Sequence, residues 1–247
     1  MTIERAILFI FLCMVVEGRV GKHHYINFAM KWLDAQQYCR QHYTDLSSVN
    51  SQSDQDELMQ AAGTGNVTEG WIGLRRDPKN NTAWKWSAGG GITYENWGPK
   101  QPDNYAEVED SVQLLNDGYW NDKDGRLPLP FYCVSITLKK EKKSWEEALE
   151  HCRNNSTNLP SLLSKTDLLQ VQGVIQEIHI TDSVWIGLRY LRDHWLWVNN
   201  DSLEYEDWPQ GEGQDHQCPI QKRCGAVTIS ETWENRNCQD KLSFICV

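Results

Sequence analysis

The sequence has no hydrophobic run long enough to cross a bilayer. Its most apolar stretch, Ala6–Val16, follows Arg5 and falls well short of the roughly 20 residues that a membrane-spanning helix needs. A positive residue, a short apolar run and small residues such as Val16 and Gly18 after it are typical of a secretory signal. We therefore expect residues 1–18 to be a signal peptide, and the mature protein to be secreted, extracellular and without a membrane anchor.

Basic residues are also in short supply. The chain has 24 Lys and Arg against 34 Asp and Glu, which gives a formal net charge of −10, and it has no stripe rich in Lys or Arg. An acidic chain of this kind is poorly suited to binding nucleic acid or anionic membranes. The motifs GxSxG and HExxH and a phosphate-binding loop are missing as well, so nothing in the sequence indicates an enzyme.

Cysteine is limited to eight residues, and one of them, Cys13, belongs to the expected signal peptide. In an exported chain the remaining cysteines are expected to form disulfides. Acceptor sequences for N-glycosylation fit the same compartment, and they occur at Asn66, Asn80, Asn154, Asn155 and Asn200. Asn154 and Asn155 are adjacent, so we expect only one of these two to carry a sugar.

Tryptophan, by contrast, is plentiful, and its positions repeat. Among the 12 tryptophans, a first set is Trp32, Trp71, Trp84, Trp86, Trp97 and Trp120, and a second set is Trp145, Trp185, Trp195, Trp197, Trp208 and Trp233. Corresponding members lie roughly 113 residues apart, and the tetrapeptide Trp-Ile-Gly-Leu occurs at both Trp71 and Trp185. Self-similarity at a fixed spacing indicates duplication. We predict two tandem domains, residues 23–134 and 135–247.

Each unit is predicted to contain the same elements in the same order. The opening strands are expected at His24–Phe28 and at Val134–Leu138. A helix follows in each unit, because apolar residues recur at helical spacing from Trp32 and from Trp145. Ser53 and Ser164, each followed three residues later by an aspartate, are predicted N-caps of a second helix. Short strands rich in Trp and separated by Gly turns come next. The predicted fold class is therefore α+β.

Oxygen-bearing side chains gather in one segment of the first unit. They belong to Gln101, Asp103, Glu109, Asn121 and Asp122. Ca²⁺ takes about six to eight oxygen ligands and tolerates the irregular geometry that loop side chains provide. Pro102 stands between two of these residues, and a cis bond before it would turn their side chains toward one point. The segment therefore predicts a calcium site.

These motifs, together with Trp120-Asn121-Asp122 and the terminal cysteines, resemble the calcium-dependent sugar-binding domains of C-type lectins. The tandem arrangement is similar to that of mannose-receptor-like proteins, and the resemblance covers nearly all of residues 23–247. It implies that each unit has two helices followed by irregular antiparallel sheets, closed by a disulfide between its first and last cysteines. The implied pairs are Cys39–Cys133, Cys152–Cys246 and an inner Cys224–Cys238.

The first unit departs from this cysteine pattern. Ser111 and Gly125 stand where the second unit has its inner pair, so we expect the segment that carries Asn121 and Asp122 to be less restrained. In the second unit Cys218 is left over. Two interpretations remain open for it: a thiol that is unpaired or exchanges with a neighbouring cysteine, or an inter-chain disulfide.

The resemblance also implies a function. The five predicted calcium ligands would also hydrogen-bond neighbouring sugar hydroxyls. The order Gln101-Pro102-Asp103 resembles that of galactose-type binders, and Tyr105 stands where such binders carry an aromatic ring. The implied role is that of a non-enzymatic protein of innate glycan recognition. The alternative is a protein-interaction scaffold in which calcium is only structural or is not bound.

The second unit is predicted to lack a working site. Glu212-Gly213-Gln214 stands where the first unit has Gln101-Pro102-Asp103, so the proline is missing. Lys222 takes the place of Glu109, which puts a positive charge beside the expected cation. Trp233-Glu234-Asn235 replaces Trp-Asn-Asp. We therefore expect this unit to present a protein surface or to act as a spacer.

Overall fold

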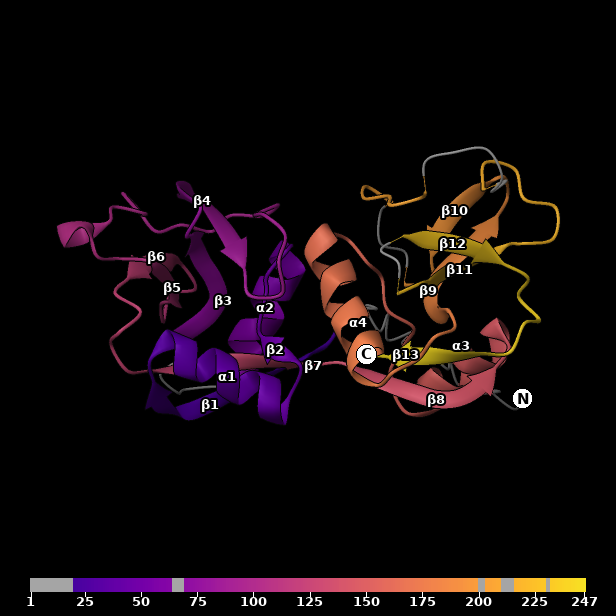
Figure 1. Ribbon diagram of the computed structural model, residues 1–247, viewed down its shortest axis with the longest axis horizontal. Coiled ribbons are helices and arrows are strands. Elements are labelled where there is room, and N and C mark those ends of the chain that lie inside the picture. The colour runs from indigo at the N-terminus through magenta and orange to yellow at the C-terminus, as the bar shows by residue number, and fades with distance from the viewer. Residues whose placement is uncertain (1–19, 64–68, 200–202, 210–215, 230–231) are drawn as a thin grey trace, which may run out of the picture.

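The computed structural model describes residues 20–63, 69–199, 203–209, 216–229 and 232–247. The expected signal peptide, two of the glycosylation sequences (Asn66 and Asn200) and the Glu212–Gln214 segment lie outside these ranges. Within the described residues, no helix combines the length and the apolar character needed to span a membrane. Figure 1 shows two lobes side by side, which we call domain 1 (β1 to β7) and domain 2 (β8 to β13).

Domain 1 is built on a seven-stranded sheet with the order β1-β7-β3-β5-β6, to which β2 adds on β7 and β4 adds on β3. Its strands are β1 (Lys22–Met30), β2 (Asp45–Leu46), β3 (Gly70–Asp77), β4 (Asn80–Trp86), β5 (Ser111–Leu114), β6 (Trp120–Lys123) and β7 (Leu129–Ser135). Its helices are α1 (Trp32–His42) and α2 (Gln52–Ala61), with a short 3-10 helix η1 (Tyr105–Glu107). The first strand pairs antiparallel with the last, so the domain closes on itself.

Domain 2 repeats this plan with a six-stranded sheet of order β12-β11-β9-β13-β8, to which β10 adds on β9. Its strands are β8 (Thr137–Lys143), β9 (Val184–Leu191), β10 (His194–Trp197), β11 (Cys224–Val227), β12 (Trp233–Arg236) and β13 (Leu242–Cys246). Its helices are α3 (Trp145–Asn154) and α4 (Lys165–Glu177). The predicted α+β class and its duplication are thus confirmed.

The first helix of each domain is held by a buried tryptophan. The buried residues of α1 are Trp32, Ala35 and Cys39, and those of α3 are Trp145, Ala148 and Cys152. Such spacing places all three on one helix face. The indole N–H of Trp32 donates to Ile72 O at 2.9 Å, and that of Trp145 donates to Ile186 O at 2.9 Å, so both polar atoms are satisfied within the core.

The second helices differ from the prediction in one place. In α4, Ser164 is the N-cap as predicted and accepts from the Asp167 N–H at 3.1 Å. In α2, however, the N-cap is Ser51 and not Ser53, and it accepts from the Asp54 N–H at 3.1 Å. Both serines have an aspartate three residues later, so the spacing could not separate them. The earlier start also lets the Asn50 N–H donate to the Asp54 carboxylate at 2.8 Å.

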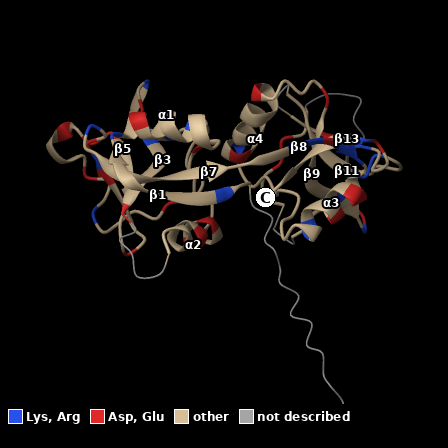
Figure 2. Ribbon diagram, turned by 90° about the horizontal axis from the view of Figure 1, so that it is seen from below, with Lys and Arg blue, Asp and Glu red and all other residues tan. Residues whose placement is uncertain are grey.

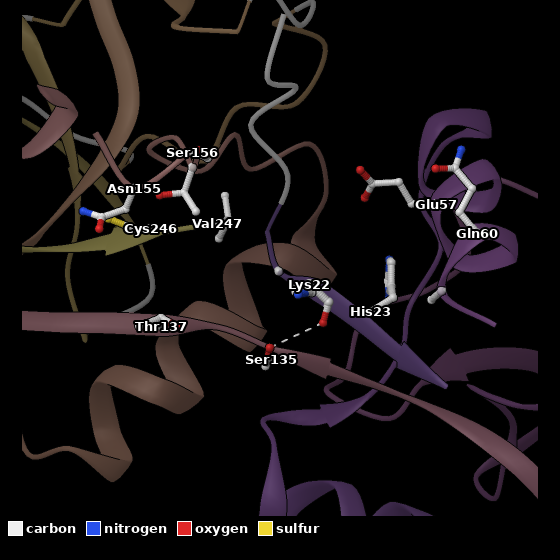
Figure 3. A pocket seen from close by; sticks show the side chains of 13 residues that line it. Lys22, His23, Glu57, Gln60, Ser135, Thr137, Asn155, Ser156, Cys246 and Val247 are labelled. Carbon is white, nitrogen blue, oxygen red and sulfur yellow. Dashed lines mark hydrogen bonds between the residues drawn. The ribbon is translucent and has the colours of Figure 1, made fainter. Parts of the chain in front are cut away.

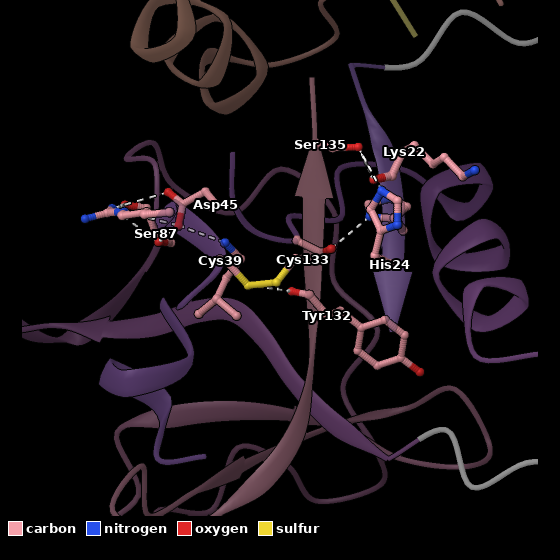
Figure 4. Close-up of a disulfide and its surroundings, with 12 residues drawn as sticks. Lys22, His24, Cys39, Asp45, Ser87, Tyr132, Cys133 and Ser135 are labelled. Carbon is pink, nitrogen blue, oxygen red and sulfur yellow. Dashed lines mark hydrogen bonds and ion pairs between the residues drawn. A yellow bond between two sulfur atoms is a disulfide. The ribbon is translucent and has the colours of Figure 1, made fainter. Parts of the chain in front are cut away.

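The described residues contain three disulfides, and the two that close the domains confirm the predicted pairs. Cys39–Cys133 is drawn in Figure 4, and Cys152–Cys246 is its counterpart. Each spans 94 residues, which in the chain-entropy model corresponds to a stabilisation of about 4–5 kcal/mol. A third bond joins Cys224 to Cys238. Cys218 lies outside these three bonds and is exposed, and its inter-chain role stays a prediction.

In domain 1 a carboxylate stands where domain 2 has its inner disulfide. Asp110 Oδ1 accepts from the Ser111 hydroxyl at 2.9 Å and from the Gly125 N–H at 3.2 Å. Its other oxygen pairs with Arg75, and this salt bridge lowers the pKa of Asp110 against the opposing effect of burial. The two segments that lack a covalent link are therefore tied by hydrogen bonds through Asp110.

The two domains meet with almost no linker. β7 ends at Ser135 and β8 begins at Thr137, and Figure 2 shows β7 leading directly into β8. Ile136 between them and Val20 are buried with the core of domain 2. The start of α4 lies against domain 1, and hydrogen bonds between described residues cross the seam. Among them are Asn50 Nδ2 to Asp167 Oδ1 (2.8 Å), Gln170 Nε2 to Ser48 Oγ (3.2 Å) and Thr166 Oγ1 to Gly89 O (3.1 Å).

Asp167 is a buried carboxyl group at this seam. Its side chain lies with Asp54 and His23 around a small cavity between the domains. Burial, and then the nearby Asp54 carboxylate, raise the pKa of Asp167 from 3.8 to about 7. Asp54 and Asp167 are the matching N3 residues of α2 and α4, so the duplication has brought two equivalent carboxylates to one interface.

A larger cleft of about 620 Å³ lies on the same seam (Figure 3). Residues of both domains line it, among them Lys22, His23 and Glu57 from domain 1 and Asn155 and Val247 from domain 2. None of the predicted calcium or sugar ligands is among its lining residues. The predicted site must therefore be sought on the outer edge of domain 1.

Candidate calcium and sugar site

The loop that carries the predicted ligands is fastened to the start of β6. The Trp120 N–H donates to Asn96 O at 2.8 Å, and the Gly98 N–H donates to Trp120 O at 2.9 Å. Trp120 itself is buried, and its indole N–H donates to Gln55 Oε1 at 2.9 Å. The chain thus enters the segment that begins at Gln101 from a fixed point beside Asn121 and Asp122.

Beyond that point the backbone doubles back on itself. The Gln101–Pro102 bond is cis, and Asn104, Ala106 and Glu107 have positive φ angles of 48°, 56° and 58°. Asn104 tolerates this left-handed region better than most residues. Its side-chain oxygen accepts from the Glu109 N–H at 3.2 Å, which brings the end of the turn back to its beginning. Sequence reasoning had assigned no role to Asn104.

The turn brings three predicted carboxylates together. Oxygens of Asp103, Glu109 and Asp122 all lie within 4.8 Å of one another, and this is the one such cluster among the described residues. Calcium–oxygen bonds are roughly 2.3–2.6 Å long, so two ligands of one ion can be about 5 Å apart. Asp103 is exposed, Glu109 is half-buried and Asp122 is buried, so the cluster opens to solvent on the Asp103 side. Its dimensions fit a calcium ion.

Asp122 forms the inner wall of this cluster and is already well supplied with donors. Its Oδ1 accepts from the Asp103 N–H at 3.0 Å, and its Oδ2 accepts from the Asn104 N–H at 2.9 Å and from Arg76 Nη2 at 3.1 Å. An ionised carboxylate has about four acceptor positions, so about one is left, and it lies on Oδ1. Asp122 could therefore offer a cation a single oxygen.

The cluster is electrostatically unfavourable as it stands. Burial raises the pKa of Glu109, and the nearby Asp122 and Asp103 raise it further, while the hydrogen bond from the Tyr105 N–H to Glu109 Oε2 (2.8 Å) lowers it. A bound cation would relieve this repulsion because it favours the charged form of each ligand. Protons would compete with the cation for the same oxygens, so binding should weaken in acid.

The other predicted residues are Gln101, Asn121 and Tyr105, and the structure gives each a different position. Gln101 Oε1 accepts from the Asp103 N–H at 3.1 Å, so this amide lies against the cluster. Asn121 is half-buried in β6, and neighbouring strand residues face opposite sides of a sheet, so its ligand role stays a prediction. The Tyr105 side chain is 75% exposed, which leaves its ring free to lie against a ligand.

Domain 2 arranges the matching positions differently. Asn235, which corresponds to Asp122, donates to the backbone oxygen of Lys222 at 3.2 Å. Glu234 accepts from the Ser183 hydroxyl and lies 3.7 Å from Arg236 Nη1. The described part of domain 2 contains no acidic cluster like that of domain 1. The carboxylate of the WEN motif, which replaces the amide of Asn121, is thus engaged by its own domain.

Both halves of the chain match one family. The description "Lectin C-type domain" matches residues 28–135 and again residues 141–247. This chain belongs to the C-type lectin domain family. The resemblance drawn from the repeated motifs is thereby confirmed, and so is the pair of terminal disulfides. Domains of this family are associated with carbohydrate recognition and calcium binding, and are typically not enzymes.

Its relatives include much larger receptors. Human C-type mannose receptor 2 is 24% identical over an alignment that covers 88% of this chain and 17% of that receptor. Human lymphocyte antigen 75 is 24% identical over 88% of this chain and 14% of its own length. Among solved structures, the carbohydrate-recognition domain of cow CD23, in the presence of GlcNAc2Man3 oligosaccharide, is 30% identical, with a TM-score of 0.42 and coverage of 47% of this chain and 87% of that one. The alignments thus span less than a fifth of the length of either of these two large receptors.

Proposed function

We propose that this protein binds glycans through one Ca²⁺ ion held by domain 1. The observation that carries the proposal is the convergence of the Asp103, Glu109 and Asp122 carboxylates at a solvent-exposed turn. Gln101 Oε1 and the remaining acceptor position on Asp122 lie beside them. Sugar hydroxyls would complete the coordination shell from the open side, and domain 2 would not take part.

Galactose-type sugars are the class that we propose for this site. The order Gln101-Pro102-Asp103 places an amide before the proline and a carboxylate after it, which fixes where a hydroxyl finds a donor and where it finds an acceptor. Tyr105, which is 75% exposed, supplies a ring for the apolar face of the sugar. A single shallow site of this kind would bind weakly, with a Kd of about 1 mM.

Export to an oxidising compartment is part of the same proposal. Three disulfides support it, since such bonds are rare in the cytosol. We propose residues 1–18 as the signal peptide and the exposed Asn80 and one of Asn154 or Asn155 as glycosylation sites. A protein-binding scaffold is the second candidate function. It is favoured by domain 2, whose described residues keep the fold without the acidic cluster.

Elution from immobilised sugars separates these two functions. We expect the full-length protein to be retained on galactose more strongly than on mannose in the presence of calcium, and to be released by EDTA. The scaffold function predicts no retention on either sugar. Retention that EDTA does not reverse would contradict a metal-dependent site.

Exchanging the residues on either side of Pro102 should change the sugar preference. The double substitution Gln101→Glu with Asp103→Asn moves the carboxylate from one side of the proline to the other and conserves the total charge. We expect preference to shift from galactose toward mannose by at least about tenfold, since one directional hydrogen bond is worth on the order of 1 kcal/mol and two are reversed. Glycan-column retention measures the shift, with calcium affinity as the control. An unchanged sugar order with intact calcium binding would refute the hydroxyl-orientation argument.

A further inference from the structure

Every nitrogen of the Arg76 guanidinium is engaged, and two of the three contact residues of the acidic cluster. Nη2 lies 3.1 Å from Asp122 Oδ2, Nε donates to Glu109 O at 3.2 Å, and Nη1 donates to Asn81 O at 2.9 Å. Its Cζ also lies 4.4 Å from the centroid of the Trp84 ring. A planar guanidinium with each of its three nitrogens engaged is fixed in position, unlike a flexible ammonium.

The partners of Arg76 are the parts of the site that must stay together. Asp122 Oδ2 also accepts from the Asn104 N–H, and the backbone of Glu109 ends the turn whose start is Asp103. Arg76 therefore spans from strand β6 to the end of the turn. Asp122 is fully buried, and a buried carboxylate that lacks a counter-charge is strongly unfavourable.

Arg76 also changes the charge of the site. The three carboxylates carry −3, and the guanidinium beside them reduces this to −2, so a single divalent cation would bring the group to neutrality. Domain 2 offers the contrast. Tyr190 follows Arg189 there as Arg76 follows Arg75 in domain 1, and the residue that matches Asp122 is the neutral Asn235. Domain 2 therefore lacks both the carboxylate and the arginine that pairs with it in domain 1.

We propose that Arg76 is a positioning residue that acts as a built-in counter-cation, keeping the calcium-binding turn assembled when no metal is bound. This inference rests on the proposed function, since it concerns the same site. Loss of metal would then leave the turn ordered, because Arg76 continues to hold Asp122 and the Glu109 backbone. The metal would then bind to a turn that Arg76 has already fixed against β6.

Amide hydrogen exchange, measured by NMR on the full chain in EDTA, tests this role. The reporters are the N–H groups of Asp103 and Asn104, which donate to Asp122. With Arg76→Met we expect both to exchange at least about tenfold faster than in the wild type, because a charge-assisted contact that holds their acceptor is gone. Calcium should restore the wild-type rates, and Arg76→Lys, which keeps the charge, should give an intermediate effect.

The matched control is Arg189→Met in domain 2. Arg189 also forms a salt bridge, at 2.9 Å to Glu146, and lies 4.9 Å from the Trp145 ring centroid, but it has no acidic cluster beside it. It should leave the two reporter amides unchanged. Unchanged reporters in Arg76→Met, or equally accelerated exchange at the β3 core amides of Ile72 and Leu74, would overturn the inference. A wild type that shows no calcium binding by isothermal titration would instead refute the proposed function, while the comparison in EDTA would still decide the role of Arg76.

Discussion

Replacing Asp103 by alanine should abolish calcium binding while leaving both domains folded. Asp103 is the exposed member of the acidic cluster, and its loss removes one of three negative charges that lie within 4.8 Å of one another. Even residues that only support a metal ligand change affinity by about 10- to 100-fold, so we expect a loss of at least about 100-fold for a ligand itself. Isothermal titration with calcium measures the change.

Glu107→Ala is the matched control for this experiment. Glu107 is an exposed carboxylate of the same turn, two residues before Glu109, and it is not part of the cluster. Its removal changes the net charge of the protein as much as Asp103→Ala does. Solvent screens such a charge, so calcium affinity should change by no more than about threefold. Equal losses for the two variants would mean that calcium responds only to the overall charge of the loop, and that no specific site exists.

The contrast between these two residues shows what the sequence could predict. Glu107 and Glu109 are the same residue type and lie two residues apart in the same turn. Only the spacing of the motif selected Glu109, which the turn then places against Asp103. The spacing identified a residue that lies in the cluster because the motif, the duplicated tryptophans and the terminal cysteines describe one local frame, and the role of Glu109 as a ligand stays a prediction. The same reasoning wrongly chose Ser53 over Ser51 as an N-cap, since both have an aspartate at the required distance.

Contacts between distant elements were beyond this kind of prediction. Arg76 lies in β3 and Asp122 in β6, and no periodicity connects them; only the folded sheet brings them within 3.1 Å. Asp110 likewise replaces a disulfide through partners at Ser111 and Gly125, and the sequence showed only that the two cysteines were missing. Arginine and aspartate are ordinary surface residues in most strands and loops. Their roles here depend on burial, which single-sequence patterns do not report.

The seam between the domains is the second place where a buried charge controls stability. Asp167 is ionised in an unfolded chain above about pH 4, whereas burial and the Asp54 carboxylate raise its pKa in the folded protein to about 7. Between these values the folded state binds the additional proton. The contribution of Asp167 to the free energy of unfolding is therefore highest below about pH 4. It falls as the pH rises and stays low above pH 7. His23 and Asp54 border the same cavity, and Lys165 is paired with Asp207 at 3.2 Å.

Asp167→Asn should remove this pH dependence. The substituted amide resembles the protonated acid, so the variant should match the wild type at pH 3 and exceed its free energy of unfolding at pH 8 by up to on the order of 4 kcal/mol, the value of a shift from 3.8 to about 7. The seam can accept an amide, because Asn50 Oδ1 is buried and finds no partner among the described residues. Turning the Asn50 amide would let that oxygen accept the new N–H. Urea titrations at both pH values measure the difference.

Asp182→Asn is the control, because Asp182 is exposed on the same domain and its hydrogen bond to Lys142 lowers its pKa. This variant should gain nothing over the wild type at pH 8. A wild type and an Asp167→Asn variant with parallel pH profiles would show that Asp167 stays charged in the seam. Acid acts in the opposite direction on the calcium cluster of domain 1, where protons compete with the cation. The same fall in pH should therefore release calcium from domain 1 while it strengthens the contact that holds the two domains together.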